Sequence, residues 1–136
     1  MNRPILIIED NEQNLYLMRF LLEASGLRVA AATNGQDGVR LASELRPAAI
    51  LLDIQLPMMD GYAVAEQLRK QSALASVPII AVTSYAMVGD RERTLAAGAT
   101  DYIEKPINPD TFVAQIRRYL AGGQEEGAIG TGADRR

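Results

Sequence analysis

Three carboxylates, one hydroxyl and one amino group stand in the sequence where short apolar runs come to an end. An acidic pair follows the first run, a lone aspartate follows the second, a threonine follows the third, and a lysine comes shortly after residue 103. Groups of these types can bind a hard metal ion and can attack or hold a phosphoryl group. The residues are Glu9, Asp10, Asp53, Thr83 and Lys105.

The composition removes several other kinds of chemistry. The chain has 136 residues and contains no cysteine and no histidine. Disulfides, thiolate nucleophiles, imidazole acid-base catalysis and zinc sites built from cysteine or histidine are therefore excluded. Carboxylates, hydroxyl groups and lysine are left to carry the function.

The three carboxylates would repel one another if they met in one place, so a cation is expected among them. Oxygen ligands alone favour a hard divalent ion that keeps several waters, which points to Mg²⁺, with Mn²⁺ as a substitute. Glu9 and Asp10 form a pair suited to the metal, whereas Asp53 stands alone after the most apolar run. We therefore expect Asp53 to be the nucleophile and an aspartyl phosphate to be the product, with the backbone carbonyl of Gln55 as a further metal ligand.

Each of these residues also has an ordinary structural explanation. An acidic pair before a helix can cap it, and an aspartate ahead of Pro57 can be a turn residue. A threonine on a strand can reflect β propensity, and a lysine on a loop is usually a solvated charge. The functional interpretation requires Thr83 and Lys105 to reach the same crevice as the carboxylates, where they would contact a phosphoryl group.

The elements that must position these residues are short strands with helices between them. Three runs are apolar throughout, which is typical of strands covered on both faces, and two weaker strands complete the set. In an open sheet of such strands, ligands bind in the loops at the carboxyl ends. The expected strands cover residues 5–8, 27–31, 48–52, 77–82 and 100–103.

Apolar residues spaced by three or four predict helices in the intervening segments. The last helix is the best marked, because Asn108 can cap it and Pro109 suits its first turn. Phe112, Ile116 and Leu120 then share one face of that helix. The other helices are expected at about 15–24, 35–46, 61–68 and 89–98, and the last of these four is thinly apolar.

This alternation of strands and helices predicts an α/β fold, with a parallel sheet, helices on both faces and right-handed crossovers. Residues 1–121 would form one domain of this kind. Residues 122–136 are rich in glycine with scattered charges, so we expect them to form a flexible C-terminal tail.

The charge and hydropathy of the chain argue against nucleic-acid and membrane partners. Acidic residues number 17 and basic residues 14, and no lysine and arginine block occurs that could hold a phosphate backbone. The apolar run within residues 1–8 is too short for a signal peptide, and no stretch approaches the ~20 apolar residues that span a membrane. We therefore expect a cytoplasmic protein.

Four segments together resemble the receiver domains of two-component response regulators, the CheY-like family. They read ILIIEDN at 5–11, LLDIQLPMMDG at 51–61, IIAVTSY at 79–85 and GATDYIEKP at 98–106. Their combination in this order and spacing is highly specific, and the resemblance covers about residues 3–121. It implies a doubly wound, flavodoxin-like sheet of five parallel strands in the order 2-1-3-4-5, with five helices.

The resemblance implies a metal site and a phosphoacceptor. Mg²⁺ would be bound by Glu9, Asp10, Asp53 and the carbonyl of Gln55, and Asp53 would be phosphorylated. Glu9 replaces the aspartate that is more frequent at its position, which lengthens the reach to the metal. Gln55 and Tyr85 stand where the family tunes the lifetime of the phosphoryl group, so that lifetime stays open.

Further roles follow from the same resemblance. Thr83 and Lys105 would contact the phosphoryl group. Thr83 would then move toward it, and the ring of Tyr102 would rotate inward behind Thr83, which makes these two the switch residues. Ordinary packing at the sheet edge explains Tyr102 equally well. The Lys105–Pro106 peptide bond is expected to be cis.

By this resemblance the phosphoryl donor is a phosphohistidine on a sensor histidine kinase or a histidine phosphotransfer protein. The chain would promote its own Mg²⁺-dependent phosphorylation and lose the group slowly, without turning over a small substrate as an enzyme does. Its output would be contact with a downstream protein through the face formed by the fourth helix, the fifth strand and the last helix. It would act as a monomer or as a dimer formed on phosphorylation.

Other interpretations compete with this one. A phosphohydrolase resembling the haloacid dehalogenase family usually has a second aspartate two residues after the nucleophile, where this chain has Gln55. A flavin carrier needs a phosphate loop after the first strand, where the acidic residues among 9–12 would repel a phosphate. A degenerate receiver normally lacks one of the site residues, and all are present. The chain could also be a receiver cut from a hybrid kinase, although Met1 directly before the first strand favours an intact short protein.

Overall fold

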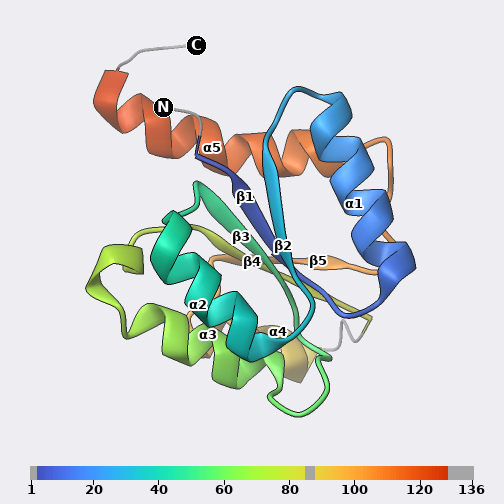
Figure 1. Ribbon diagram of the computed structural model, residues 1–136, viewed down its shortest axis with the longest axis vertical. Helices are drawn as coiled ribbons and strands as arrows, with labels where there is room; N and C mark the ends of the chain where they lie inside the picture. The colour runs from blue at the N-terminus through green and yellow to red at the C-terminus, as the bar shows by residue number, and fades with distance from the viewer. Residues whose placement is uncertain (1–2, 85–87, 129–136) are drawn as a thin grey trace.

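The computed structural model describes the backbone of residues 3–84 and 88–128 and the side chains of residues 3–84 and 91–120. These residues contain one sheet of five parallel strands in the order β2-β1-β3-β4-β5 (Figure 1). The strand order that the resemblance implied is therefore confirmed. The strands are β1 (Ile5–Ile8), β2 (Val29–Ala32), β3 (Ala49–Asp53), β4 (Ile79–Thr83) and β5 (Asp101–Glu104).

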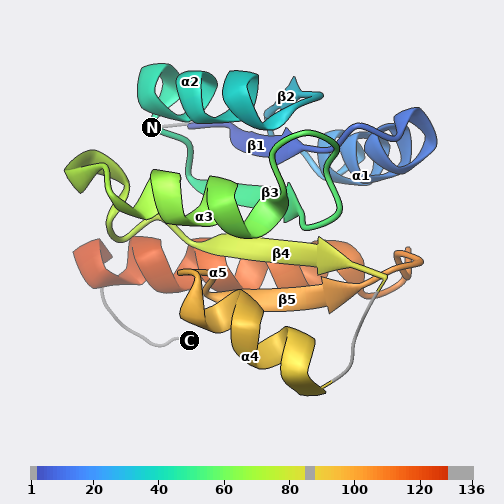
Figure 2. The same cartoon turned by 90° about the horizontal axis from the view of Figure 1, so that it is seen from below.

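Helices cover both faces of this sheet, as the α/β prediction requires. Figures 1 and 2 show α1 (Glu12–Ala24) and α5 (Phe112–Ala128) on one face and the other helices on the opposite face. No helix in the described ranges is long and apolar enough to cross a membrane. The helices of the opposite face are α2 (Gly35–Leu45), α3 (Gly61–Arg69) with the 3-10 turn η1 (Ser72–Leu74), and α4 (Val88–Ala96).

The side chains of each strand alternate between two apolar cores, one on either face of the sheet. Ile5 and Ile7 of β1 pack with residues of α1 and α5, whereas Leu6 and Ile8 pack with residues of α2 and α3. All of these strand residues are at most 1% exposed. Burial on both faces explains why the sequence of the strand is an unbroken apolar run.

Three helices begin at a polar side chain that caps them. The side-chain oxygens of Asn11, Asn34 and Asp60 accept the backbone N–H groups of residues 14, 37 and 63, at the starts of α1, α2 and α3. Such caps satisfy backbone donors that have no partner within the helix. Asn11 and Asp60 follow β1 and β3, so these caps fix the chain direction just beyond the carboxyl ends of two central strands.

The last helix differs from its prediction at both ends. The sequence placed a cap at Asn108, but α5 begins at Phe112. The side chain of Asn108 accepts the N–H of Asp110 at 2.9 Å, and its carbonyl accepts the N–H of Phe112 at 3.0 Å, so a turn precedes the helix. The helix continues to Ala128, and its last part is formed by residues that we expected to belong to the tail.

Candidate functional site

Parallel pairing brings the ends of four neighbouring strands to one edge of the sheet. The register of β1 and β3 makes Glu9 and Asp53 the next residues on adjacent strands. Asp53 is paired with the residue before Thr83 on β4, and Lys105 follows the residue of β5 that is paired with Thr83. The four strand ends that carry these residues therefore lie side by side at one edge of the sheet.

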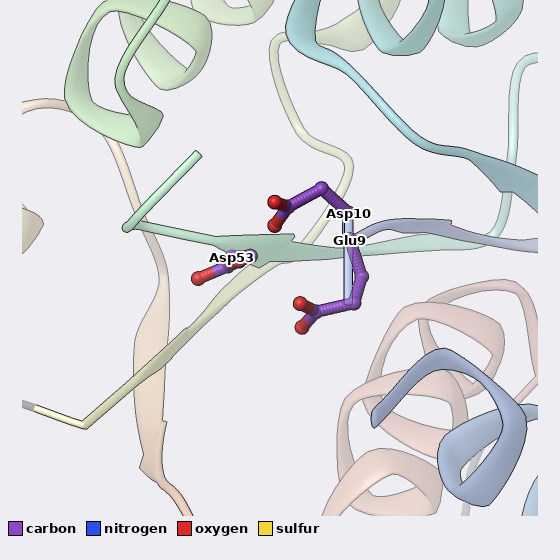
Figure 3. Close-up of side chains that lie close together, drawn as sticks. All are labelled: Glu9, Asp10 and Asp53. Atoms are coloured by element: carbon purple, nitrogen blue, oxygen red, sulfur yellow. The ribbon is translucent and has the colours of Figure 1, made fainter. Parts of the chain in front are cut away.

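The three carboxylates form a cluster at this edge. One oxygen from each of Glu9, Asp10 and Asp53 lies within 4.8 Å of the others. Figure 3 shows Glu9 and Asp10 at the end of β1 with their carboxylates directed to the side on which Asp53 lies. Glu9 and Asp53 are buried, whereas Asp10 is exposed, so the cluster opens to solvent on the side of Asp10.

Lys105 reaches into the same cluster. Its Nζ lies 3.3 Å from Glu9 Oε1 and 3.3 Å from Asp53 Oδ1, and its side chain is 12% exposed. The backbone N–H of Lys105 donates to the carbonyl of Thr83 at 2.8 Å, which fixes the strand end from which the side chain leaves. The peptide bond to Pro106 is cis, as expected.

Within the cluster, Glu9 has a strongly raised pKa. The pKa of this carboxyl is raised from 4.5 to about 7, first by burial and then by the charge of Asp53 and a hydrogen bond with its side chain. Lys105 and the backbone N–H of Asn11, which donates to Glu9 Oε2 at 3.1 Å, act in the opposite direction. One ammonium group therefore does not compensate the carboxylates.

The oxygen atoms of the cluster fit a hard divalent cation. Glu9 Oε1 is buried and receives no hydrogen bond from the described residues, because Lys105 Nζ is at ion-pair distance without hydrogen-bond geometry. A buried oxygen without a donor is costly, and a metal ion would remove that cost. The donor set of Glu9, Asp10 and Asp53 can therefore hold such an ion.

Asp53 is oriented by the loop that follows it. The backbone N–H of Gln55 donates to Asp53 Oδ1 at 2.9 Å. This loop folds back onto the strand end at Gly61, whose N–H donates to the carbonyl of Ile54 at 3.0 Å. A Cβ at Gly61 would lie 2.7 Å from the carbonyl oxygen of Asp53 and would overlap the backbone of Ile54, so only glycine fits this close approach.

The side chain of Gln55 has a contact that the sequence analysis did not anticipate. Its Oε1 accepts the backbone N–H of Ser84 at 3.1 Å, which links the loop after β3 to the end of β4. The sequence analysis considered only the carbonyl of Gln55, and its role as a metal ligand stays a prediction. Tyr85, the other residue expected to affect the phosphoryl lifetime, lies outside the described residues.

The two predicted switch residues lie on neighbouring strands. Thr83 is 4% exposed at the end of β4, and Tyr102 is paired with Ala81, two residues earlier. Tyr102 is half-buried beside a groove of about 460 Å³, and its ring lies under the guanidinium of Arg91 of α4. The switch roles of both residues, including the rotation of the ring, stay predictions.

Known proteins that are similar in sequence to this chain are response regulators. The family described as "Response regulator receiver domain" matches residues 5–117. The polar-differentiation response regulator DivK of Brucella anthropi is 44% identical over 120 residues, which cover 88% of this chain and 98% of that protein. DivK of Brucella ovis is 42% identical over 120 residues with the same coverage.

Solved structures show the same fold. The receiver domain of the sensor histidine kinase PA1611 from Pseudomonas aeruginosa is 37% identical and has a TM-score of 0.82, covering 89% of this chain and 99% of that one. That structure has a magnesium ion coordinated in its active site cleft. A CheY-like receiver domain protein from Methanospirillum hungatei is 31% identical with a TM-score of 0.85, covering 93% and 100%.

These relationships set aside the phosphohydrolase and flavin-carrier interpretations. They agree with the five-stranded parallel sheet and with the acidic cluster at its carboxyl edge. The chain belongs to the response regulator receiver domain family and is a response regulator of two-component signalling.

Proposed function

We propose that Asp53 accepts a phosphoryl group from a phosphohistidine of a sensor kinase or a histidine phosphotransfer protein. A carboxylate oxygen of Asp53 forms a bond to phosphorus while the bond from phosphorus to the donor's imidazole nitrogen breaks. The electron pair of that bond stays on the imidazole, which takes up a proton from solvent. The observation that carries this proposal is that Asp53 lies close to Glu9, Asp10 and the ammonium group of Lys105 at the carboxyl edge of the sheet.

We assign the metal to the same cluster. Glu9, Asp10, Asp53 and the carbonyl of Gln55 would hold Mg²⁺, or Mn²⁺ in its place, and the ion would neutralise charge on the phosphoryl oxygens. The buried oxygen of Glu9 that receives no hydrogen bond from the described residues supports this assignment. The exposed position of Asp10 supports it as well, because this side of the cluster is open to a donor and to metal-bound water.

Lys105 and Thr83 would hold the product. The ammonium group of Lys105 lies 3.3 Å from Asp53 Oδ1, so it is close enough to contact an oxygen of a phosphoryl group on that side chain. The hydroxyl of Thr83 would donate to a second oxygen. Because the product adds roughly one and a half to two negative charges to an acidic site, the end of β4 should be drawn toward it.

The signal would leave through the face formed by α4, β5 and α5. In this proposal Thr83 moves toward the phosphoryl group, the ring of Tyr102 follows it inward, and the face changes its preference for a downstream protein. The groove of about 460 Å³ beside Tyr102 supports this choice of face, since it is lined by residues of all three elements, among them Arg91, Tyr102 and Gln115. The protein would act as a monomer or as a dimer formed on phosphorylation.

The proposal is tested by incubating the protein with acetyl phosphate and Mg²⁺ and measuring its intact mass. We expect a single phosphoryl adduct that requires the metal, forms with Mn²⁺ as well, and is absent after addition of a chelator. The adduct should be lost in Asp53→Asn. A matched control is Asp60→Asn, which changes an exposed aspartate that caps α3, so the adduct should still form.

Two results would contradict the proposal. An adduct that persists in Asp53→Asn would place the acceptor on another residue. An adduct that forms equally well without a divalent ion would remove the role assigned to Glu9 and Asp10.

A further inference from the structure

The described part of α4 is attached to the rest of the domain by small side chains. Thr94 is 2% exposed and Ala97, just after the helix, is 7% exposed. Leu95, the largest apolar side chain among residues 91–96, is 39% exposed. In α3, by contrast, Val64 and Leu68 are completely buried. Among the residues whose side chains are described, apolar burial therefore stabilises the position of α4 much less than that of α3.

Two arginines of α4 add to this small contact by lying over tyrosine rings on two different neighbours. The guanidinium carbon of Arg91 is 5.3 Å from the centre of the Tyr102 ring on β5. The guanidinium carbon of Arg93 is 4.0 Å from the centre of the Tyr62 ring on α3. A guanidinium over an aromatic face is attracted by the ring, and both arginines are exposed. Figure 2 shows α4 beside β5, at the edge of the sheet.

The two tyrosines differ in their freedom to move. Tyr62 belongs to a helix that is fixed by buried apolar residues. The backbone N–H of Tyr102 donates to Asp101 Oδ1 at 2.7 Å, and the other oxygen of Asp101 accepts the hydroxyl of Tyr119 of α5. These bonds fix the backbone at Tyr102, while its side chain borders the groove of about 460 Å³. The ring of Tyr102 can therefore turn while its strand stays in place.

We propose that the Arg91–Tyr102 contact holds the ring in the position of the unphosphorylated protein and so opposes activation. The Arg93–Tyr62 contact keeps α4 on α3 in both states and does not oppose it. This inference rests on the proposed function, because it concerns the inward rotation of Tyr102 that follows phosphorylation. When the ring turns inward it leaves the guanidinium of Arg91, and the attraction between them is lost.

The consequence for phosphoryl binding follows from linkage. An interaction present only in the inactive arrangement lowers the apparent affinity for any ligand that requires the active one. A cation–aromatic contact at an exposed site has a strength that corresponds to a factor of about two to five in an equilibrium constant. Removal of the contact should therefore tighten the binding of a phosphoryl analogue by about two- to five-fold.

The test is a titration of the full chain with beryllium fluoride in excess Mg²⁺. Calorimetry measures the affinity, and the amide NMR signals at the end of β4 report the change in conformation. Arg91→Gln removes the cation, and we expect an affinity about two- to five-fold higher than that of the parent protein. Arg91→Lys keeps a positive charge near the ring, so its affinity should return toward that of the parent. In Arg91→Gln without ligand, the amide signals should already be displaced toward their ligand-bound positions.

Arg93→Gln is the matched control. It removes the same charge from the same helix and breaks a contact of the same kind, but Tyr62 is not a switch residue. The affinity for beryllium fluoride should stay at the parent value in this variant. In a Tyr102→Leu background, where the ring is absent, Arg91→Gln should have no further effect on the affinity.

The outcomes separate this inference from the function on which it rests. If the parent protein does not bind beryllium fluoride, or if Asp53→Asn binds it equally well, the proposed function fails and the inference fails with it. If the parent binds normally and Arg91→Gln has the same affinity, only the inference is overturned. An equal gain in Arg93→Gln, or a gain that persists with Tyr102→Leu, would also overturn it.

Discussion

Two edges of the domain are built in different ways. The carboxylate edge, which holds Glu9, Asp10 and Asp53, stands on strands whose side chains are all buried. The α4 edge, which we define as α4 with the tyrosines that it contacts, is held by small buried residues and by arginines exposed to solvent. The first edge has packed apolar cores behind it, whereas the described side chains of α4, residues 91–96, bury little apolar surface.

This difference matches the two tasks of a switch. A metal site and a nucleophile need side chains held in one geometry, which a buried parallel sheet provides. A surface that changes its partners needs an element that can move at small free-energy cost, and such elements have few buried apolar contacts. The sheet joins the two, because β4 ends at Thr83 on the carboxylate edge and pairs with β5 beside α4.

The two edges should differ most in the loss of stability that follows truncation of a leucine. Leu51 of β3 is completely buried, whereas Leu95 of α4 is 39% exposed. Leu51→Ala should lower the free energy of unfolding by about 2–5 kcal/mol, because it leaves a cavity in the core. Leu95→Ala should lower it by less than about 0.5 kcal/mol. Urea unfolding of both variants measures the two values, and similar losses would contradict the distinction between the edges.

Arg69, the last residue of α3, lies next to the α4 edge but should be held far more firmly than the arginines of α4. Its guanidinium donates to the carbonyls of Leu74, Val77 and Gly98, at 2.8, 2.7 and 2.8 Å, and so joins the segments that lead into β4 and β5. Arg69→Met removes one donor from each of these carbonyls and should lower the free energy of unfolding by about 2–3 kcal/mol.

The control for Arg69 is the equivalent change at an exposed arginine. Arg93→Met breaks only the contact with the Tyr62 ring, and its loss should stay below about 1 kcal/mol. The same urea experiment compares the two variants. A loss at Arg93 as large as that at Arg69 would show that α4 is attached more firmly than its contacts indicate.

Glu9 should make the carboxylate edge sensitive to pH when no metal is bound. Burial and the neighbouring charge of Asp53 raise the pKa of Glu9 from 4.5 to about 7, so the folded protein holds this proton more tightly than the unfolded chain does. The stability contributed by this carboxyl is therefore fully present below its unfolded pKa of 4.5 and is lost as the pH rises through about 7. Glu9→Gln has no such proton to lose.

The measurement compares unfolding of the parent and of Glu9→Gln in the presence of a chelator. Relative to the parent, the free energy of unfolding of the variant should rise by about 2 kcal/mol between about pH 5 and about pH 8. Addition of Mg²⁺ should then stabilise the parent more than the variant, because a ligand has been removed. Glu12→Gln, at the exposed first turn of α1, controls for the change in net charge. If the difference in unfolding free energy between the parent and Glu9→Gln does not change with pH, the raised pKa of Glu9 is contradicted.

The sequence predicted the carboxylate edge well because local patterns determine it. Unbroken apolar runs identify buried strands, and parallel pairing then brings the residues after those runs to one edge. Glu9, Asp53 and Thr83 were found in this way. Lys105 was proposed from its place after the fifth expected strand, but a lysine on a loop is by itself a weak signal, and the resemblance added most of the support for it.

The α4 edge was harder to predict because its contacts join side chains distant in the sequence. The position of Arg91 over Tyr102 depends on how α4 is placed on β5, and no apolar periodicity specifies that placement. The turn before α5 is similar, since Asn108 suited a helix cap but its side chain accepts the N–H of Asp110 instead. The sequence identified Asn108 as a hydrogen-bonding residue but did not identify the N–H group that its side chain accepts.

The smallest expected effect concerns the hydrogen bond between Gln55 and Ser84, which crosses from the loop after β3 to the end of β4. Gln55→Ala removes the acceptor of the Ser84 N–H at an exposed position, where water can replace it, so the free energy of unfolding should fall by less than about 1 kcal/mol. Local opening at Ser84 should respond more clearly, with amide hydrogen exchange about two- to five-fold faster.

Two comparisons make this small effect interpretable. Gln55→Glu keeps an oxygen acceptor at the same reach and should preserve the slow exchange of the Ser84 amide. The amide of Leu51, deep in β3, should exchange at the parent rate in both variants, because global stability is nearly unchanged. If the Ser84 amide of the parent already exchanges as fast as an unprotected one, this bond does not restrain β4. The end of that strand would then be mobile before phosphorylation, and the carboxylate edge would be rigid only as far as Asp53.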